Sequence, residues 1–326
     1  MKNNTIEEII EKIRNAKNIL ILSHINPDGD CIGTASALAL LLKKHFSKDS
    51  VLVNNSKIPE IYRFLPLSEN YKTYEEVENK EDFDTVITVD CAAKDRLTSA
   101  IKAFDKAETT INFDHHKTNP YFAKYNYVFG DLSSAGEVLY NFAKNAGLSF
   151  DKDIANCLYT AILTDTGGFK FENTTAETFR AVADLMEYGI NPCLIYRCCY
   201  ESKPLEMVKL NAHAVSKSCF LCNGKLAYTI ITLEDMKTNK ALNEHTDGIV
   251  EVLRQVNSVD IAFVIKETDD GCSKISLRSK TSDVSKIAAA FNGGGHTFAA
   301  GCTIKKPYNV ALNKILDIIN EEYGLC

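Results

Sequence analysis

Short apolar runs and amphipathic segments alternate along the first part of the chain. One apolar run covers residues 18–23, and the apolar positions of residues 35–44 then recur at helical spacing. Further short runs, rich in β-branched residues, lie at 51–54, 85–89 and 109–113. Strands that alternate with helices are typical of an α/β fold with a mostly parallel sheet and flanking helices.

Helical spacing dominates the end of this first part. It recurs in residues 134–144, 153–163 and 175–188, so we expect helices rather than more strands there. Glycine, asparagine and proline interrupt the pattern directly afterwards. We therefore predict a first domain over residues 1–190 and a helical linker over residues 191–218.

A second, smaller α/β domain is predicted over residues 219–326, because strand-like and helix-like patterns alternate again there. The strand-like runs cover 226–232, 261–267 and 274–278, and the helix-like segments cover 247–255 and 284–291. At roughly 150 residues per domain, two domains also suit a chain of 326 residues.

The composition is that of a folded protein, since 45% of the residues are hydrophobic and 25% are charged. The 37 basic and 43 acidic residues give a net charge of -6, which provides no general attraction for a long nucleic acid duplex. A local basic pocket for a short phosphorylated ligand is compatible with this balance.

Nothing in the pattern predicts contact with a membrane. The most apolar stretch, residues 35–42, is far shorter than the roughly 20 residues that span a bilayer. Thr5 and Glu8 have the spacing of a capping box at the start of an amphipathic helix, which differs from a signal peptide. We expect a cytoplasmic protein; a homodimer is compatible with the sequence, which does not decide it.

Histidines and aspartates gather where three of the predicted strands end. They are His24, Asp28 and Asp30 after the first strand, Asp90 after the run at 85–89, and Asp114, His115 and His116 after the run at 109–113. The carboxyl ends of parallel strands share one edge of a sheet, so these side chains can converge despite their separation in sequence. Taken alone, Asp28 and Asp30 are more often turn-formers that bond their own backbone.

Asp165 follows the helical segment 153–163 and could point into the same cleft, although alone it could be part of a simple turn. The candidate ligands are then His24, Asp28, Asp30, Asp90, His115 and Asp165. Imidazoles and carboxylates without thiolates suit two hard or borderline divalent ions, most naturally Mn²⁺, better than a structural zinc.

The second domain offers a candidate anion pocket. Its residues are Arg278 and Ser279 at a predicted strand end, and Gly293, Gly294, Gly295 and His296 in a predicted loop. Glycines let backbone N–H groups approach a phosphate closely, and the histidine adds a donor. A plain flexible loop is the alternative interpretation of the glycines.

These motifs together resemble the DHH/DHHA1 phosphoesterase family, whose members include nano-RNases, and the resemblance covers nearly the whole chain. The matching residues are His24-x-x-Pro27-Asp28-Gly29-Asp30, Asp90, Asp114-His115-His116, Asp165 and Gly293-Gly294-Gly295-His296-x-x-Ala299-Ala300-Gly301. The resemblance implies a catalytic DHH domain, a DHHA1 substrate domain, and a nucleotide held in the cleft between them.

The resemblance also implies roles for the site residues. His24, Asp28 and Asp90 would bind one divalent ion, and Asp30, Asp90, His115 and Asp165 would bind the other, so that Asp90 bridges the two. His116 would orient the phosphate or protonate the leaving oxygen, and Asp114 would orient the neighbouring imidazoles. In the DHHA1 domain, Arg278 would hold a terminal phosphate with His296 and the glycine backbone, assisted by Ser279.

The main hypothesis from this resemblance is a Mn²⁺-dependent hydrolase of short single-stranded RNA, including the dinucleotide pApA, that also removes the 3′-phosphate of pAp. Cleavage of cyclic di-AMP would use the same site with another pocket shape, and a pyrophosphatase would need a different second domain. The alternative of another class is a nucleotide sensor without turnover. The presence of every ligand position argues against a sensor.

Overall fold

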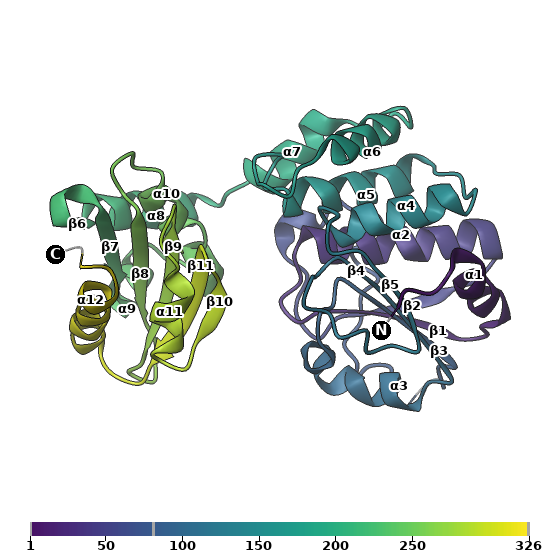
Figure 1. The fold of residues 1–326 in the computed structure, drawn as a ribbon, viewed down its shortest axis with the longest axis horizontal. Coiled ribbons are helices and arrows are strands. Elements are labelled where there is room, and N and C mark those ends of the chain that lie inside the picture. Colours follow the sequence, from purple (N-terminus) through teal and green to yellow (C-terminus); the bar gives the residue numbers. More distant parts are fainter. Residues whose placement is uncertain (1, 80–81, 325–326) are drawn as a thin grey trace. The chain divides into compact units, whose positions relative to one another are not determined.

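A parallel sheet forms the centre of the first part of the protein, in a computed structural model that describes residues 2–79 and 82–324. Its strands are β1 (Ile19–Ser23), β2 (Ser50–Val53), β3 (Thr85–Val89), β4 (Thr109–Asp114) and β5 (Tyr125–Val128). They lie in the order β2-β1-β3-β4-β5, and each neighbouring pair is parallel (Figure 1). The predicted α/β class and its mostly parallel sheet are confirmed, although β5 was not predicted.

Helices cover both faces of this sheet, which explains why its central strands β1 and β3 are buried along their whole length. In β1, Ile19 and Ile21 belong to the core on one face, whereas Leu20 and Leu22 belong to the core on the other. The first face is covered by α2 (Gly29–Phe46), α4 (Ala135–Asn145), α5 (Lys152–Asp165) and α6 (Ala176–Met186), and α1 (Ile6–Asn15) adds to the same core. On the opposite face lie α3 (Ile101–Lys106) and the 3-10 segment η2 (Lys94–Ala100) (Figure 1).

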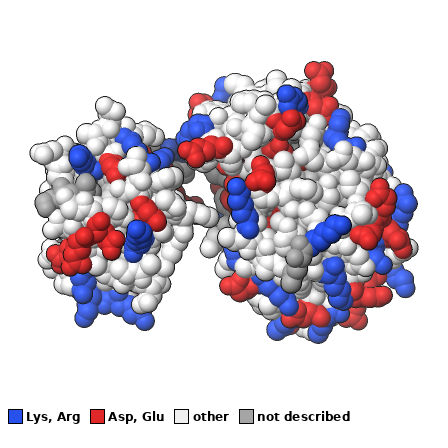
Figure 2. Space-filling model, in the orientation of Figure 1, with Lys and Arg blue, Asp and Glu red and all other residues white. Residues whose placement is uncertain are grey.

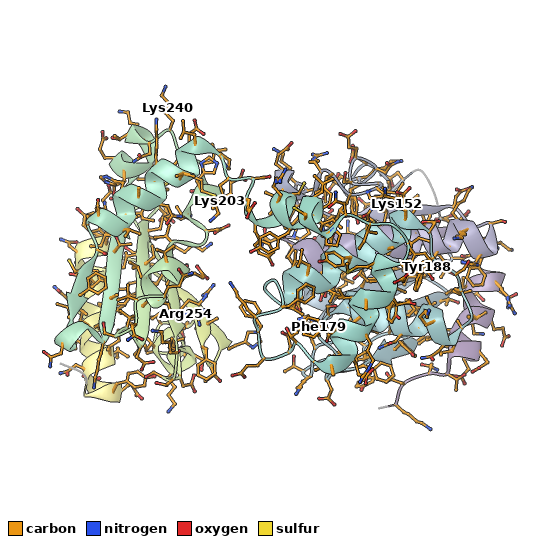
Figure 3. All side chains as sticks on the ribbon, turned by 90° about the horizontal axis from the view of Figure 1, so that it is seen from above. Lys152, Phe179, Tyr188, Lys203, Lys240 and Arg254 are labelled. Carbon is orange, nitrogen blue, oxygen red and sulfur yellow. The ribbon has the colours of Figure 1, made fainter. Side chains whose placement is uncertain are left out.

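The helix after α6 was not predicted as part of the first domain. Asn191 caps α7 (Pro192–Tyr200). Pro192 lies in the first turn, where a backbone N–H has no partner within the helix, so the missing N–H of proline removes no helical hydrogen bond. The proline that suggested an interruption therefore starts a helix. Just before it, Tyr188 packs against Phe150 with ring centroids 5.5 Å apart, while Phe179 on α6 remains exposed (Figure 3).

The chain divides into two units between Ser202 and Lys203. This break falls inside the predicted linker, and the helices on its two sides belong to different units. α7 lies in the first unit, and α8 (Leu205–Ser216) lies in the second.

A mixed sheet forms the centre of the second unit. Its strands are β6 (Cys219–Leu221), β7 (Leu226–Ile231), β8 (Ile261–Glu267), β9 (Ser273–Ser279), β10 (Gly294–His296) and β11 (Ala299–Ile304), in the order β10-β11-β9-β8-β7-β6. One face carries α8 and α10 (Ile249–Arg254), and the other carries α11 (Val284–Ala289) and α12 (Tyr308–Tyr323). Shorter elements are η1 (Glu60–Tyr62), η3 (Cys222–Gly224), α9 (Leu233–Thr238) and η4 (Asn243–Thr246).

The glycine-rich segment predicted as a loop is mostly a strand. Residues 294–296 form β10, which pairs with β11 so that His296 lies opposite Ala299. Gly295 has a φ of 147°, and a Cβ there would lie 2.4 Å from the carbonyl oxygen of Ala299. The glycine therefore permits the close approach of two strands rather than a flexible loop.

Charged side chains of both signs are interspersed on the visible surface of each unit (Figure 2). Within the described residues, no helix combines the length and the apolar character needed to cross a membrane.

Close packing of α2 against α5 positions the strand ends described below. Gly33 on α2 faces the backbone of α5, and a Cβ at this position would lie 2.5 Å from the carbonyl oxygen of Cys157. The two helices can therefore approach closely only because residue 33 has no side chain.

We predict that Gly33→Ala lowers the free energy of unfolding of the first unit by about 1–3 kcal/mol, the usual cost of overpacking. Calorimetric unfolding of the full chain measures this change. Lys43→Ala on the same helix is the matched control, because Lys43 forms only an exposed ion pair with Asp49. Equal stabilities of the two variants would contradict the packing argument.

Candidate active site

Asp90 occupies the centre of a cluster of ionisable side chains at the ends of the parallel strands. It directly follows β3, its N–H donates to the carbonyl oxygen of Phe113 (2.9 Å), and it is 3% exposed. Its φ of 52° lies in the left-handed region, which aspartate tolerates better than most residues. This turn of the backbone places the carboxylate between the ends of β1 and β4, the neighbours of β3.

The two carboxylate oxygens of Asp90 face two different histidines. Oδ2 lies 3.2 Å from Nε2 of His24, which follows β1. Oδ1 lies 3.5 Å from Nε2 of His115, which follows β4. Asp90 thus joins two groups of side chains that come from opposite sides of its strand.

The first group contains His24, Asp28 and Asp90. Nε2 of His24 lies 3.9 Å from Oδ1 of Asp28, whose side chain is half exposed. Asp28 also caps α2, because the same oxygen accepts the N–H of Cys31 (3.0 Å). The buried thiol of Cys31 lies close enough to His24 and Asp90 to share a metal ion with them, a thiol that the sequence analysis did not include.

The second group contains Asp30, Asp90, His115 and Asp165. Nε2 of His115 lies 3.8 Å from Oδ2 of Asp30 and 3.6 Å from Oδ2 of Asp165. Asp30 comes from the first turn of α2, and Asp165 is the last residue of α5. All six predicted ligands are therefore brought together by the first unit.

Burial and like charge govern the pKa values of the carboxyls in the second group. Burial raises the pKa of Asp30 well above its usual value, and the charges of Asp90 and Asp165 raise it further. Burial also raises the pKa of Asp165 to about 7, against the opposing charge of His115. Positive charge from another source would therefore favour the ionised form of both side chains.

The central carboxyl and the imidazoles shift in the opposite direction from what burial alone would cause. Burial would raise the pKa of Asp90, but the contacts with His115 and His24 hold it below its usual range. Burial would lower the pKa values of both histidines, but the contact with Asp90 raises that of His24 to about 12 and that of His115 to about 10. The metal-free cluster is thus held together by imidazolium–carboxylate attraction.

His116 and Asp114 form a separate pair beside this cluster. Nδ1 of His116 lies 2.7 Å from Oδ1 of Asp114, which is completely buried. The other carboxylate oxygen of Asp114 accepts the side-chain N–H of Asn119 (2.5 Å). Because Asp114 occupies Nδ1 of His116, the Nε2 atom is the one available to a ligand.

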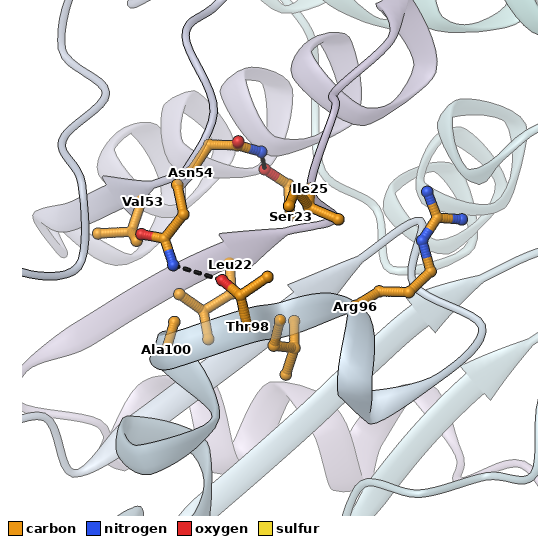
Figure 4. Close-up of a pocket in the computed structure, with 10 residues that line it drawn as sticks. Leu22, Ser23, Ile25, Val53, Asn54, Arg96, Thr98 and Ala100 are labelled. Carbon is orange, nitrogen blue, oxygen red and sulfur yellow. Dashed lines mark hydrogen bonds between the residues drawn. The ribbon is translucent and has the colours of Figure 1, made fainter. Parts of the chain in front are cut away.

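Two residues near His24 carry contacts that sequence analysis missed. The side chain of Asn54 donates to Ser23 Oγ at 2.8 Å (Figure 4). It also donates to the carbonyl oxygen of His24 at 2.8 Å. Nη2 of Arg96, labelled in the same view, lies 2.9 Å from Nδ1 of His24. The signal that could have identified Arg96 is its place shortly after a strand end, since no motif includes it.

The donor set fits divalent cations. Each of the groups His24–Cys31–Asp90, Asp90–His115–His116 and Asp30–His115–Asp165 could offer ligand atoms that lie within 4.8 Å of one another. Buried carboxylates of like charge are normally paired or coordinate metals. Oxygen and imidazole donors suit hard or borderline ions.

In the second unit, Arg278 and His296 share one face of the sheet. Ala299 on β11 pairs with Arg278 on β9 and with His296 on β10, so the three side chains lie in one cross-strand row. Nε of Arg278 donates to Oε1 of Glu251 (2.9 Å), and Nη1 donates to the carbonyl oxygen of Leu277. The remaining guanidinium N–H groups point to no described acceptor.

The other predicted residues of this unit differ in accessibility. His296, Gly294 and Gly295 are exposed, and Gly293 is partly exposed. Ser279 is completely buried, and its hydroxyl donates to the carbonyl oxygen of Ser282. Ser279 therefore supports the strand end instead of facing a ligand in this structure.

Comparisons with known proteins agree with this architecture. Residues 18–162 match the model of the DHH family, N-terminal domain, and residues 223–324 match the model of the DHHA1 domain. The bifunctional oligoribonuclease and PAP phosphatase NrnA of Thermus thermophilus is 30% identical over 308 residues, which cover 93% of this chain and 90% of that protein.

A more distant relative and a solved structure extend these matches. The probable manganese-dependent inorganic pyrophosphatase of Streptococcus agalactiae is 25% identical, over 88% of this chain and 95% of its own. The crystal structure of an exopolyphosphatase-related protein from Bacteroides fragilis superposes with a TM-score of 0.92 at 25% identity, over 98% of this chain and 96% of that one.

We predict that Asp165→Asn stabilises the metal-free protein at pH 8 and weakens its binding of divalent ions. The pKa of Asp165 rises from 3.8 to about 7 on folding, so its ionisation opposes folding as the pH increases through this interval. One pKa unit corresponds to about 1.4 kcal/mol, so we expect a gain of about 1 kcal/mol or more at pH 8 and a smaller gain at pH 5.

Thermal unfolding in EDTA and in Mn²⁺ measures both effects. Wild type should be the less stable protein in EDTA and the more stable one in excess Mn²⁺. Asp131→Asn is the control, because the side chain of Asp131 is 98% exposed. A lower stability of Asp165→Asn in EDTA at pH 8 would contradict the proposed repulsion among these carboxylates.

Proposed function

This chain belongs to the DHH family and is a phosphoesterase, and on that premise we propose its metal and its substrates. In this proposal it is a cytoplasmic, Mn²⁺-dependent enzyme. It hydrolyses short oligoribonucleotides to mononucleotides, and pAp to AMP and phosphate. The two activities named for the Thermus thermophilus relative support this choice of substrates. The acidic net charge of -6 also favours a short ligand, because a few nucleotides need only local cations.

The observation that carries the proposal is the position of Asp90 between two groups of ligands. Its Oδ2 faces His24, and its Oδ1 faces His115. We assign His24, Asp28 and Asp90 to one divalent ion, and Asp30, Asp90, His115 and Asp165 to the other. When bound, two such ions lower the pKa of a shared water and stabilise charge on the attacking and leaving oxygens of a phosphoryl group.

Mn²⁺ is the proposed metal because the donors are carboxylates and imidazoles. The manganese-dependent relative supports the same choice. Cys31 stays outside the assigned ligands, because carboxylates and imidazoles suit Mn²⁺ better than a soft thiolate does.

His116 is proposed to act on the substrate, not on the metal ions. Its Nδ1 is engaged by the buried carboxylate of Asp114, which fixes the orientation of the ring. Its Nε2 can then donate a hydrogen bond to a phosphoryl oxygen or a proton to the leaving oxygen. Asp114 has a positioning role in this proposal and does not contact the reacting atoms.

Arg278 and His296 are proposed to hold a terminal phosphate of the substrate. Glu251 engages Nε of Arg278 and the carbonyl oxygen of Leu277 engages one N–H of Nη1, so Nη2 and the second N–H of Nη1 remain for a phosphate. Arg278 and His296 lie on the same face of the sheet. Gly294 and Gly295 are exposed on the same strand as His296, and their missing side chains would let a phosphate approach the backbone closely. An anion pocket of this kind selects substrates that end in a phosphate.

We predict that the protein hydrolyses pApA, a five-nucleotide RNA and pAp faster than long RNA, cyclic di-AMP or pyrophosphate. Initial rates in Mn²⁺ on this panel provide the measurement. Asp90→Asn should lower the rate by about a thousand-fold or more, because the interactions it removes contribute several kcal/mol to the transition state.

The panel separates the proposal from its alternatives. Fastest cleavage of cyclic di-AMP would identify a signalling phosphodiesterase, and hydrolysis of pyrophosphate alone would identify a pyrophosphatase. Saturable binding of nucleotides without products in Mn²⁺ would identify a sensor. Each of these results would replace the proposed function.

We also predict that Arg278→Ala raises the KM for pAp and pApA by about 10–100-fold, because a hydrogen bond to a charged group contributes about 1.5–3 kcal/mol. Arg278→Lys should give an intermediate value, since it keeps the charge and loses the planar fork. Lys314→Ala, on the exposed surface of α12, is the matched control. An unchanged KM in Arg278→Ala would exclude this residue from the pocket.

A further inference from the structure

A buried carboxylate lies behind the candidate metal ligands. Glu137, in the first turn of α4, is 1% exposed. Within the described residues, no lysine, arginine or histidine forms an ion pair with it. Burying a carboxylate without an ion pair costs free energy of folding. The hydrogen bonds of Glu137 therefore indicate its role.

One carboxylate oxygen of Glu137 accepts hydrogen bonds from two segments of the chain. Oε2 accepts the N–H of Ser133 (3.1 Å), the hydroxyl of Ser133, and the hydroxyl of Thr178 on α6 (3.0 Å). These bonds fix Ser133, two residues before α4, and connect it to α6. The other oxygen, Oε1, is buried without a hydrogen-bond partner in the described part of the chain.

The first consequence concerns Asp30. The segment that Glu137 holds leads into Ser134, which caps α4. The next two N–H groups, those of Ala135 and Gly136, donate to the two carboxylate oxygens of Asp30 at 2.7 and 2.8 Å. The beginning of α4 therefore orients Asp30 through these hydrogen bonds and the positive end of the helix dipole, together with the hydroxyl of Thr34, which donates to Oδ1 (3.0 Å).

The second consequence concerns Asp165. The carbonyl oxygen of Ser133 accepts the side-chain N–H of Asn173 (2.8 Å). The same side-chain nitrogen lies 3.2 Å from the carbonyl oxygen of Asp165 and 3.5 Å from its Oδ2. A chain of hydrogen bonds through Ser133 and Asn173 thus also connects the Glu137 carboxylate to the end of α5.

We propose that Glu137 is a positioning residue that holds Asp30 and Asp165 in place as two ligands of the same divalent ion. The inference rests on the proposed function, because it assumes that these aspartates bind a metal. Both carboxylates face Nε2 of His115, which would complete the set. Outer residues that orient metal ligands typically change metal affinity 10–100-fold when they are altered.

A purely structural role as a helix cap is the competing explanation. A cap needs one acceptor for the N–H groups of the first turn, and Ser134 already provides it for Glu137. Leaving Oε1 buried and unpaired costs stability. Stability alone therefore accounts poorly for a carboxylate at this position.

Titration of the metal-free full chain with Mn²⁺, followed by electron paramagnetic resonance of the free ion, tests the proposal. For Glu137→Ala we expect the affinity for one of two Mn²⁺ equivalents to fall about 10–100-fold, and that for the other to change less. Excess Mn²⁺ should restore kcat on pApA, while KM for pApA stays within about two-fold of wild type.

Two further variants keep the test decisive if Glu137→Ala folds poorly. Glu137→Gln can still accept the same three hydrogen bonds through its carbonyl oxygen, so we expect it to keep most of the Mn²⁺ affinity. Asn173→Ala removes only the connection to Asp165 and should weaken the same Mn²⁺ equivalent. Glu177→Gln, on the exposed start of α6, is the matched control and should bind Mn²⁺ as wild type does.

The outcomes separate the inference from the proposed function. Wild-type Mn²⁺ affinity in Glu137→Ala and Asn173→Ala, even with lower thermal stability, would overturn the positioning role. A wild-type protein that binds two Mn²⁺ ions but hydrolyses no member of the substrate panel would contradict the proposed function alone. In that case the comparison of Mn²⁺ affinities still decides the inference.

Discussion

Repulsion among buried carboxylates is the constraint on which the rest of the first unit depends. Asp30, Asp90 and Asp165 share one small volume with two imidazoles, and burial raises the pKa of two of these three carboxyls. Attraction to the imidazolium groups outweighs burial and like charge for Asp90, but not for Asp30 and Asp165, whose pKa values stay raised. A rigid framework must therefore hold the side chains together, and the parallel sheet with its closely packed helices provides it.

Much of the fold and most of the first-unit site were predictable from sequence because they depend on local rules. Apolar runs identified the central strands, and polar residues directly after them had to meet at one edge of a parallel sheet. The family resemblance then supplied the roles of Asp90 and His116, which spacing alone could not assign. β5 was missed because tyrosine and asparagine interrupt its apolar pattern.

The contacts that no sequence pattern predicts join distant segments of the chain. Glu137 and Asn173 are 36 positions apart, and only the folded chain joins them through Ser133. The glycine run was predicted as a loop, because composition cannot distinguish a flexible segment from two closely paired strands. In Gly295, the absent Cβ serves that pairing.

The helix start at Ser134 links stability to chemistry. The free N–H groups at a helix N-terminus can bind a nearby acidic group. Here they bind the side chain of Asp30, which is fixed before any metal ion arrives. The carboxylate loses little conformational freedom when it binds a cation, which favours affinity. Oδ1 of Asp30 accepts both the N–H of Gly136 and the hydroxyl of Thr34, whereas Oδ2 accepts the N–H of Ala135 alone among the described residues. Oδ2 therefore keeps a lone pair for a metal ion. The start of α4 thus determines how the carboxylate of Asp30 is oriented among the candidate metal ligands.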